Sequence, residues 1–266
     1  MSIAKDPRLG VIADAHPHPL LFATISGAHL YGFPSPDSDF DLRGAHVLPL
    51  DQVIGLEPGR ETIESMRVEQ QMELDLVTHD VGKFVRLLSR PNGYVLEQLL
   101  SPLVVRTSAA HRELCELGRR SVTRAHARHY LGFATSQRDL WHKHEPRRLK
   151  PLLYIYRVLL TGIHLMGSGE IQANLSVLLD DCAGLLACKS LLSDLGLEEL
   201  VVRKQTGAEK QPYAGAELVQ HEAAIEGLRA ELEASAAISA LPATLPAEVA
   251  RGLHDFLVRT RLAAGS

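Results

Sequence analysis

The feature that most constrains the fold is a short apolar segment, residues 20–26, which runs into Gly27 and is followed by an alternating segment, residues 39–48. The first segment, LLFATIS, has the character of a short buried strand. In the second, DFDLRGAHVL, polar and apolar residues alternate, so Asp39 and Asp41 are expected on one face of a strand. The two segments together predict a sheet in the N-terminal part of the chain.

Strand and helix signals continue to about residue 108. Residues 60–67 and 72–78 have the pattern of two further strands, joined by a polar link at 69–71. Asp80 and Asn92 are each followed by apolar residues at helical spacing, so each is expected to cap a helix. The N-terminal part is therefore expected to be a mixed sheet with helices on one side.

Beyond residue 108 strand signals fade, and apolar residues recur at spacings of three and four. The expected helices are 109–135, 147–166, 172–182, 184–194, 215–237 and 246–262, with a polar loop over 203–215. The predicted fold class is therefore α+β, with a mixed-sheet domain at 1–108 and an all-helical domain at 109–266.

The net charge of −4 hides a basic segment, residues 119–157, which carries ten Lys or Arg against two acids. The segment has a charge of +8 and the rest of the chain −12. Such a concentration indicates a polyanionic partner, either nucleotide phosphates or RNA or DNA. A solvated helix face with scattered ion pairs would show the same composition, and charge alone does not separate the two.

Composition favours a cytoplasmic globular protein. No apolar run approaches the roughly 18 to 20 residues of a membrane span, and the N-terminus lacks the pattern of a signal peptide. The three cysteines, Cys115, Cys182 and Cys188, show no CxxC spacing. They are expected to be reduced thiols.

The two aspartates after the glycine turn form a candidate catalytic site. Carboxylates at i and i+2 of a strand can bind divalent cations through oxygen, and a glycine turn lets backbone N–H groups approach a triphosphate. Asp39 and Asp41 alone are a weak signal, because such pairs occur often on solvent-facing strands. A third carboxylate would complete the site, and Asp75 on a downstream alternating strand is the choice, with Glu73 as the alternative.

The stretch from Ser26 to Gly44 resembles the glycine-turn and DxD signature of the polymerase-β-like nucleotidyltransferases. More narrowly, it resembles the RNA-repair-pathway DNA polymerase β family. The likeness covers residues 20–180 approximately and rests on these motifs: Gly27-x-His29-x-Tyr31-Gly32, Asp37-Ser38-Asp39-x-Asp41-x-Arg43-Gly44, Asp75 through Asp80, Asn92, Glu97-x-x-x-Ser101-Pro102, His129-Tyr130 and Lys150-x-x-x-Tyr154-x-x-Arg157.

The resemblance implies a polymerase-β-type fold, two Mg²⁺ or Mn²⁺ ions, a nucleoside triphosphate such as ATP, and a hydroxyl acceptor. Asp39, Asp41 and Asp75 would be the catalytic and metal-binding residues. The reaction would transfer a nucleoside monophosphate to a hydroxyl, with a nucleic-acid 3′ end favoured by the basic segment. The helical domain would close the cleft over the acids.

The resemblance also implies a set of nucleotide-binding residues: Ser26, Gly27, Ala28, His29, Arg43, Lys150, Tyr154 and Arg157. Positions 150, 154 and 157 share one helical face, although a helix whose basic residues only snorkel would look the same. Arg43 is expected beside the acids, where it either balances their charge or holds a phosphate.

One position departs from the superfamily pattern, which usually has Gly-Ser where this chain has Gly27-Ala28. The missing hydroxyl removes one hydrogen bond to the triphosphate, worth about 1–2 kcal/mol. Two other functions stay open, and the missing hydroxyl bears on the second of them. One is a regulator or antitoxin that nucleotidylates a protein, and the other is a non-catalytic nucleotide-binding module.

Overall fold

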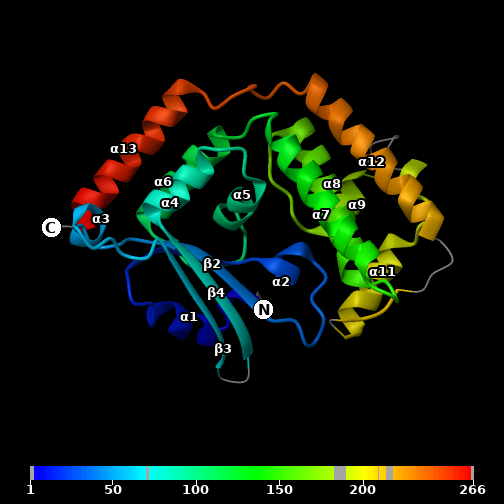
Figure 1. Cartoon of the computed structure of the whole chain (residues 1–266), viewed down its shortest axis with the longest axis horizontal. Coiled ribbons are helices and arrows are strands. Elements are labelled where there is room, and N and C mark those ends of the chain that lie inside the picture. The colour runs from blue at the N-terminus through cyan, green and yellow to red at the C-terminus, as the bar shows by residue number, and fades with distance from the viewer. Residues whose placement is uncertain (1–2, 70–71, 183–189, 209, 214–217, 265–266) are drawn as a thin grey trace. The chain divides into compact units, whose positions relative to one another are not determined.

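The computed structural model describes residues 3–69, 72–182, 190–208, 210–213 and 218–264. It is α+β, as predicted, with a five-stranded mixed sheet followed by C-terminal helices (Figure 1).

Contacts divide the chain into two compact units. The first contains Met1–Leu30, Asp39–Val122 and Leu245–Ser266, and the second contains Tyr31–Ser38 and Thr123–Thr244. This grouping differs from a single boundary at residue 108, because α6 (Ala109–Arg120) packs against β1 (Leu20–Ile25) and the C-terminal helix packs against α4 (Val81–Leu88) and α6. The assignment of a catalytic and a closing domain stays a prediction.

The sheet of the first unit has the strand order β3-β4-β2-β1-β5. Its strands are β1 (Leu20–Ile25), β2 (Phe40–His46), β3 (Thr62–Glu69), β4 (Met72–Asp80) and β5 (Val104–Arg106). β2 and β4 run parallel, whereas the other neighbouring pairs are antiparallel. The four predicted strands are confirmed. β5 was not predicted, because three residues are too few to show an alternating pattern.

Helices lie on both faces of this sheet, so the expectation of one covered side was wrong. Helix α1 (Pro7–Asp14) places Leu9 and Ile12 in a core with Leu42 of β2 and Leu74 of β4. This helix begins behind the capping side chain of Asp6 and is only two turns long, which makes its pattern hard to detect.

The opposite face of the sheet packs against α4 (Val81–Leu88), α5 (Gly93–Leu99) and α6 (Ala109–Arg120). Phe22 of β1 meets Phe84 edge-on and stacks on His111. Asp80 accepts a hydrogen bond from Gly82 N, and Asn92 accepts one from Val95 N, so both predicted helix caps are confirmed.

The C-terminal helix α13 (Ala247–Ala264) belongs to this first unit and contacts α4 and α6. Arg261 forms an ion pair with Asp80, and both side chains are nearly buried. The short elements η1 (Ile3–Lys5) and α3 (Asp51–Ile54) complete the described part of the unit apart from α2, which carries the glycine turn.

The second unit is helical and is built on α8 (Leu149–Ser168), which is buried along most of its length. Around it lie α7 (His126–Lys143), α9 (Leu175–Cys182), α11 (Leu197–Thr206) and α12 (Leu218–Ile238). α8, α9, α12 and α13 correspond to predicted helices. α11 enters the segment 203–215, where a loop was predicted. Residues 184–189 of the predicted helix 184–194, and residues 70–71 of the predicted link, lie outside the described residues.

The predicted helix 109–135 was wrong as a single element, because α6 ends at Arg120 and α7 begins at His126. Ser121 Oγ donates to the carbonyl of Gly118, and Thr123 N donates to the His126 ring. Side chains that satisfy the backbone groups at these positions compete with a continuous helix.

Among the helices that the structure describes, none combines the length and apolarity that a membrane span requires. Cys115 is a free, half-buried thiol. The side chain of Cys182 and the whole of Cys188 lie outside the described residues.

Candidate functional site

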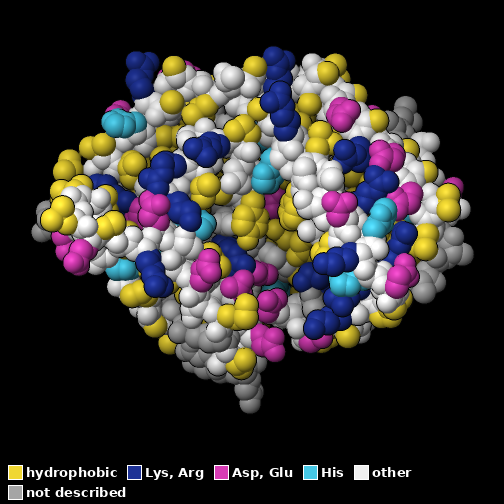
Figure 2. Space-filling view, in the orientation of Figure 1, with side chains coloured by type: hydrophobic (Ala, Val, Ile, Leu, Met, Phe, Trp, Pro, Cys, Tyr) yellow, Lys and Arg dark blue, Asp and Glu magenta, His cyan; other side chains and the backbone are white. Residues whose placement is uncertain are grey.

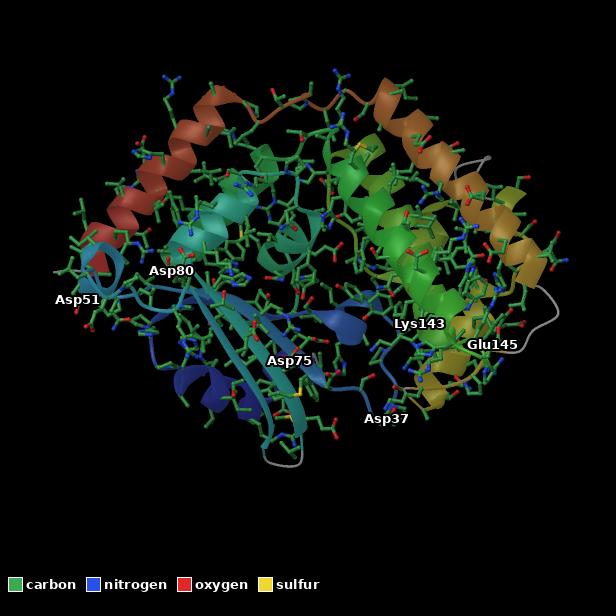
Figure 3. The ribbon with its side chains drawn as sticks, in the orientation of Figure 1. Asp37, Asp51, Asp75, Asp80, Lys143 and Glu145 are labelled. Atoms are coloured by element: carbon green, nitrogen blue, oxygen red, sulfur yellow. The ribbon has the colours of Figure 1, made fainter. Side chains whose placement is uncertain are left out.

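Strand pairing brings two of the predicted acids together. Asp41 of β2 and Asp75 of β4 are register partners in the parallel pair, so their side chains leave the same face of the sheet. Figure 3 shows Asp75 on its strand, away from Asp80 at the strand end. Asp39 comes directly before β2, and all three carboxylates are half-buried. Glu73, the alternative third acid, is exposed.

The guanidinium of Arg43 lies between the two paired acids. Its Nη2 donates to Oδ1 of Asp41 at 2.6 Å and to Oδ2 of Asp75 at 2.7 Å. Nη1 donates to the carbonyls of Leu42 and Asp75, and Nε donates to the hydroxyl of Tyr94 at 3.0 Å. Burial works to lower the pKa of Arg43, but Tyr94, Asp41 and Asp75 outweigh it and raise that pKa.

The glycine turn packs directly against Asp41. Gly27 begins the short helix α2 (Gly27–Tyr31) with φ of +60°, a conformation that glycine adopts without strain. A Cβ at this position would lie 1.7 Å from Oδ2 of Asp41. Ser26 N donates to the Asp41 carbonyl at 2.8 Å, which ties the turn to β2.

The side chains of the turn are largely buried. Ser26 is fully buried, and its hydroxyl has no hydrogen-bond partner among the described residues. Ala28 is 4% exposed. His29 is half-buried and stacks on Phe40, with ring centroids 4.5 Å apart. Burial lowers the pKa of His29, and Asp39 offsets part of that effect.

The other predicted nucleotide-binding residues, Lys150, Tyr154 and Arg157, lie on α8 in the second unit. They gather around Tyr31: the Arg157 guanidinium lies 3.9 Å above the Tyr31 ring, and Tyr154 meets that ring edge-on at 5.3 Å. The ammonium of Lys150 lies 5.8 Å from the Tyr154 ring. Arg157 is fully buried. Nucleotide binding by these residues stays a prediction.

The basic segment 119–157 contains both paired and exposed side chains. Within the second unit, Glu222 pairs with Arg138, His142 and Arg147. Other basic residues of that unit, including Arg124, Arg128 and Lys143, are exposed. Figure 2 shows Lys and Arg side chains gathered over the end of α7, with Asp and Glu among them.

The donor set of the site fits a hard divalent cation. Carboxylate oxygens are the ligands that Mg²⁺ and Mn²⁺ prefer, and Asp41 and Asp75 present them from neighbouring strands. The absence of a Cβ at Gly27 leaves the backbone close to Asp41, and the buried Ser26 hydroxyl lacks a partner among the described residues. Over the part of the chain that the structure describes, no three His, Cys, Asp or Glu side chains form a ready-made metal cluster.

Tyr94 is the contact that sequence reasoning missed. It comes from α5, beyond the Asn92 cap, and reaches Arg43 across a separation of 51 residues. The Asn92 cap could be predicted from the residues around it, whereas the hydrogen bond between Tyr94 and Arg43 could not.

The first 259 residues match the RNA repair pathway DNA polymerase beta family, known as RlaP. This match covers nearly the whole chain. The protein belongs to the RlaP family. The resemblance drawn from the glycine turn and the aspartates is thereby confirmed, and a polymerase-β-type nucleotidyltransferase is the activity that the family name implies.

Two relatives of this RlaP protein are known only as uncharacterized proteins. The chain is 33% identical over 156 residues to MJ0002 of Methanocaldococcus jannaschii, across 59% of this chain and 64% of the relative. It is 26% identical over 193 residues to YcgL of Bacillus subtilis, across 71% of each chain. The matched stretch thus spans somewhat less than two thirds of the archaeal relative.

Proposed function

We propose that this protein is a metal-dependent nucleotidyltransferase that moves a nucleoside monophosphate from a nucleoside triphosphate to a hydroxyl, with a nucleic-acid 3′ end as acceptor. The observation that carries the proposal is the packing of Gly27 against Asp41, with Asp75 in register beside it. A triphosphate bound at the turn would lie next to the carboxylates that must hold its cations. Family membership supports the class of reaction.

Each acid has a role that follows from its position. Asp39, Asp41 and Asp75 would hold two Mg²⁺ or Mn²⁺ ions, which would neutralise charge on the phosphates and on the attacking hydroxyl. Asp75 would receive the proton of that hydroxyl, directly or through water. The bond between the α- and β-phosphates breaks, pyrophosphate leaves, and the acceptor oxygen bonds to the α-phosphorus.

The turn would bind the triphosphate by its backbone. Gly27 and Ala28 would present N–H groups to the phosphates, and the Ser26 hydroxyl could add a bond that the missing serine at 28 does not provide. His29, Lys150, Tyr154 and Arg157 complete the proposed nucleotide-binding set. ATP is the donor to test first, and the exposed arginines of segment 119–157 are proposed to contact the acceptor backbone.

The test is incubation with each labelled NTP and dNTP, Mg²⁺ or Mn²⁺, and RNA and DNA oligonucleotides. Wild type should transfer label, and Asp41→Asn and Asp75→Asn should lower the rate by about 10³-fold or more, in line with losses at other catalytic centres. Glu73→Gln is the matched control, because Glu73 lies on the same strand but is exposed. A loss with Glu73→Gln and not with Asp75→Asn would move the third acid to Glu73.

The destination of the label separates the alternatives. Label on an oligonucleotide supports the proposal. Label on a protein would replace it with a protein-nucleotidylating regulator. No transfer to any acceptor, with nucleotide still bound, would leave a nucleotide-binding module.

A further inference from the structure

We infer that Arg43 and Tyr94 form a positioning pair, in which Tyr94 fixes the guanidinium and the guanidinium sets the orientation of both Asp41 and Asp75 for metal binding. The inference rests on the proposed function and assigns roles to two residues that do not themselves bind the cation. The sequence left two roles open for Arg43, balancing the charge of the acids or holding a phosphate, and the inference favours the first.

The first step is the hydrogen-bond capacity of Arg43. A guanidinium has five N–H donors. In this protein five acceptors take them: the Tyr94 hydroxyl, the carbonyls of Leu42 and Asp75, and one oxygen each of Asp41 and Asp75. A phosphate could bind Arg43 only if at least one of these bonds broke. The geometry therefore favours positioning over phosphate binding.

The second step is the way in which the carboxylates are held. Nη2 bonds Oδ1 of Asp41 and Oδ2 of Asp75, so the guanidinium engages one oxygen of each acid. Neighbouring strands lie about 4.8 Å apart, so two ionised acids in register repel each other. The arginine charge between them offsets that repulsion before any cation binds.

The third step is the support of Arg43 itself. Its side chain is 8% exposed, and its Nε–H points to Tyr94. Tyr94 is in the first turn of α5, where the Asn92 cap fixes the backbone. Helix α5 thus reaches the acids through one phenol and one guanidinium, without supplying a ligand. Partners of this kind behind metal ligands typically contribute 10–100-fold to metal affinity.

The test compares Tyr94→Phe, Arg43→Lys and Arg106→Lys with wild type. Tyr94→Phe keeps the ring and removes one hydrogen bond, whereas Arg43→Lys keeps the charge and removes the fork that spans two acids. Arg106→Lys is the matched control, because Arg106 of β5 pairs with the exposed Asp14 of α1. Mn²⁺ binding is measured by electron paramagnetic resonance without nucleotide, followed by kcat and KM for the NTP.

Positioning predicts that Arg43→Lys weakens Mn²⁺ binding by about 10–100-fold and that Tyr94→Phe weakens it by about threefold to tenfold. The rate kcat should fall in step while KM for the NTP changes less than threefold, and Arg106→Lys should match wild type. The inference is overturned if both variants bind Mn²⁺ normally and KM for the NTP rises, because Arg43 would then be a phosphate ligand.

A further readout separates this inference from the proposed function. The Arg43 Nε–H in the metal-free protein should give a slowly exchanging ¹⁵N NMR signal that disappears in Tyr94→Phe. If wild type neither binds Mn²⁺ nor transfers nucleotide, the proposed function fails, and this signal still decides whether the hydrogen bond between Arg43 and Tyr94 exists. A rapidly exchanging Arg43 Nε–H in wild type would contradict the Arg43–Tyr94 pair, whatever the transferase activity.

Discussion

At Gly27 a hydrogen atom in place of a side chain lets Asp41 keep its position. Gly27→Ala would place a methyl group 1.7 Å from Oδ2 of Asp41 in a backbone conformation with φ of +60°. Either the turn or the carboxylate must move. The backbone conformation itself costs about 1–2 kcal/mol, and a displacement of about 1 Å at reacting groups can cost about 100-fold in rate.

We therefore expect Gly27→Ala to remain folded, to lose about 100-fold or more in transfer rate, and to bind Mn²⁺ more weakly. Single-turnover transfer and urea unfolding measure the two effects. The control is Gly132→Ala in α7, where a Cβ meets nothing within 4 Å. It should gain up to about 1 kcal/mol of stability and keep full activity. Normal transfer by Gly27→Ala would mean that the turn is not part of the site.

The contrast between Asp41 and Tyr94 shows how far sequence reasoning reaches at this scale. Alternation along one strand is a local property, so the face from which Asp41 leaves its strand could be predicted before the structure, whereas Asp39 lies just before that strand. The pairing of Asp41 with Asp75 and the bond from Arg43 to Tyr94 depend on strand order and on contacts between distant segments. Nothing in the spacing of these residues specifies that order.

At the scale of elements, the segment Tyr31–Ser38 joins the second unit although it lies between the glycine turn and the aspartates in the chain. Lys204 of α11 is fully buried and donates to Ser35 Oγ at 2.8 Å. Gln205 Nε2 donates to the Gly32 carbonyl at 2.7 Å. Helix α11 thus holds this segment at Gly32 and at Ser35.

Lys204→Met should therefore lower the free energy of unfolding by about 1.5–3 kcal/mol, because a buried charged donor and its bond to Ser35 are lost while side-chain volume is kept. It should also speed proteolysis within residues 31–38. Urea unfolding and limited proteolysis provide the measurements. Lys210→Met, at an exposed lysine, is the control and should behave as wild type. Equal stability of the two variants would contradict a structural role for Lys204.

The prediction of helix boundaries succeeded where a capping residue marked the boundary, and it failed where no such residue did. The Asp80 and Asn92 caps were predicted and are confirmed. The break between α6 and α7 has no Gly or Pro to mark it, and it depends on the His126 ring accepting a bond from Thr123 N. A contact of that kind is apparent only once the chain has folded.

At the scale of the whole molecule, each unit buries a histidine in the neutral form. Burial lowers the pKa of His46 in the first unit to about 4, with His16 adding to the shift and Asp80 opposing it. Burial also lowers the pKa of His126 in the second unit to about 4, against a hydrogen bond with Thr123. The Nε2 atoms of both rings have no partner among the described residues.

Because both pKa values are lowered in the folded protein, acid should lower the free energy of unfolding. Below pH of about 6.5 the unfolded chain takes up protons at both histidines, whereas the folded units resist protonation until about pH 4. Stability should therefore fall as the pH drops through this window, by about 1–3 kcal/mol for each histidine, and should change little from this cause above pH 7.

Urea unfolding at pH 7.0 and pH 5.0 tests the prediction, with Trp141 fluorescence reporting the second unit because this buried residue of α7 is the single tryptophan. His126→Gln should reduce the pH dependence seen by Trp141, since glutamine cannot take up the proton. His46→Gln should leave that signal unchanged while reducing the dependence seen by far-ultraviolet circular dichroism, which reports both units. Equal wild-type stability at the two pH values would show that these histidines do not control acid unfolding.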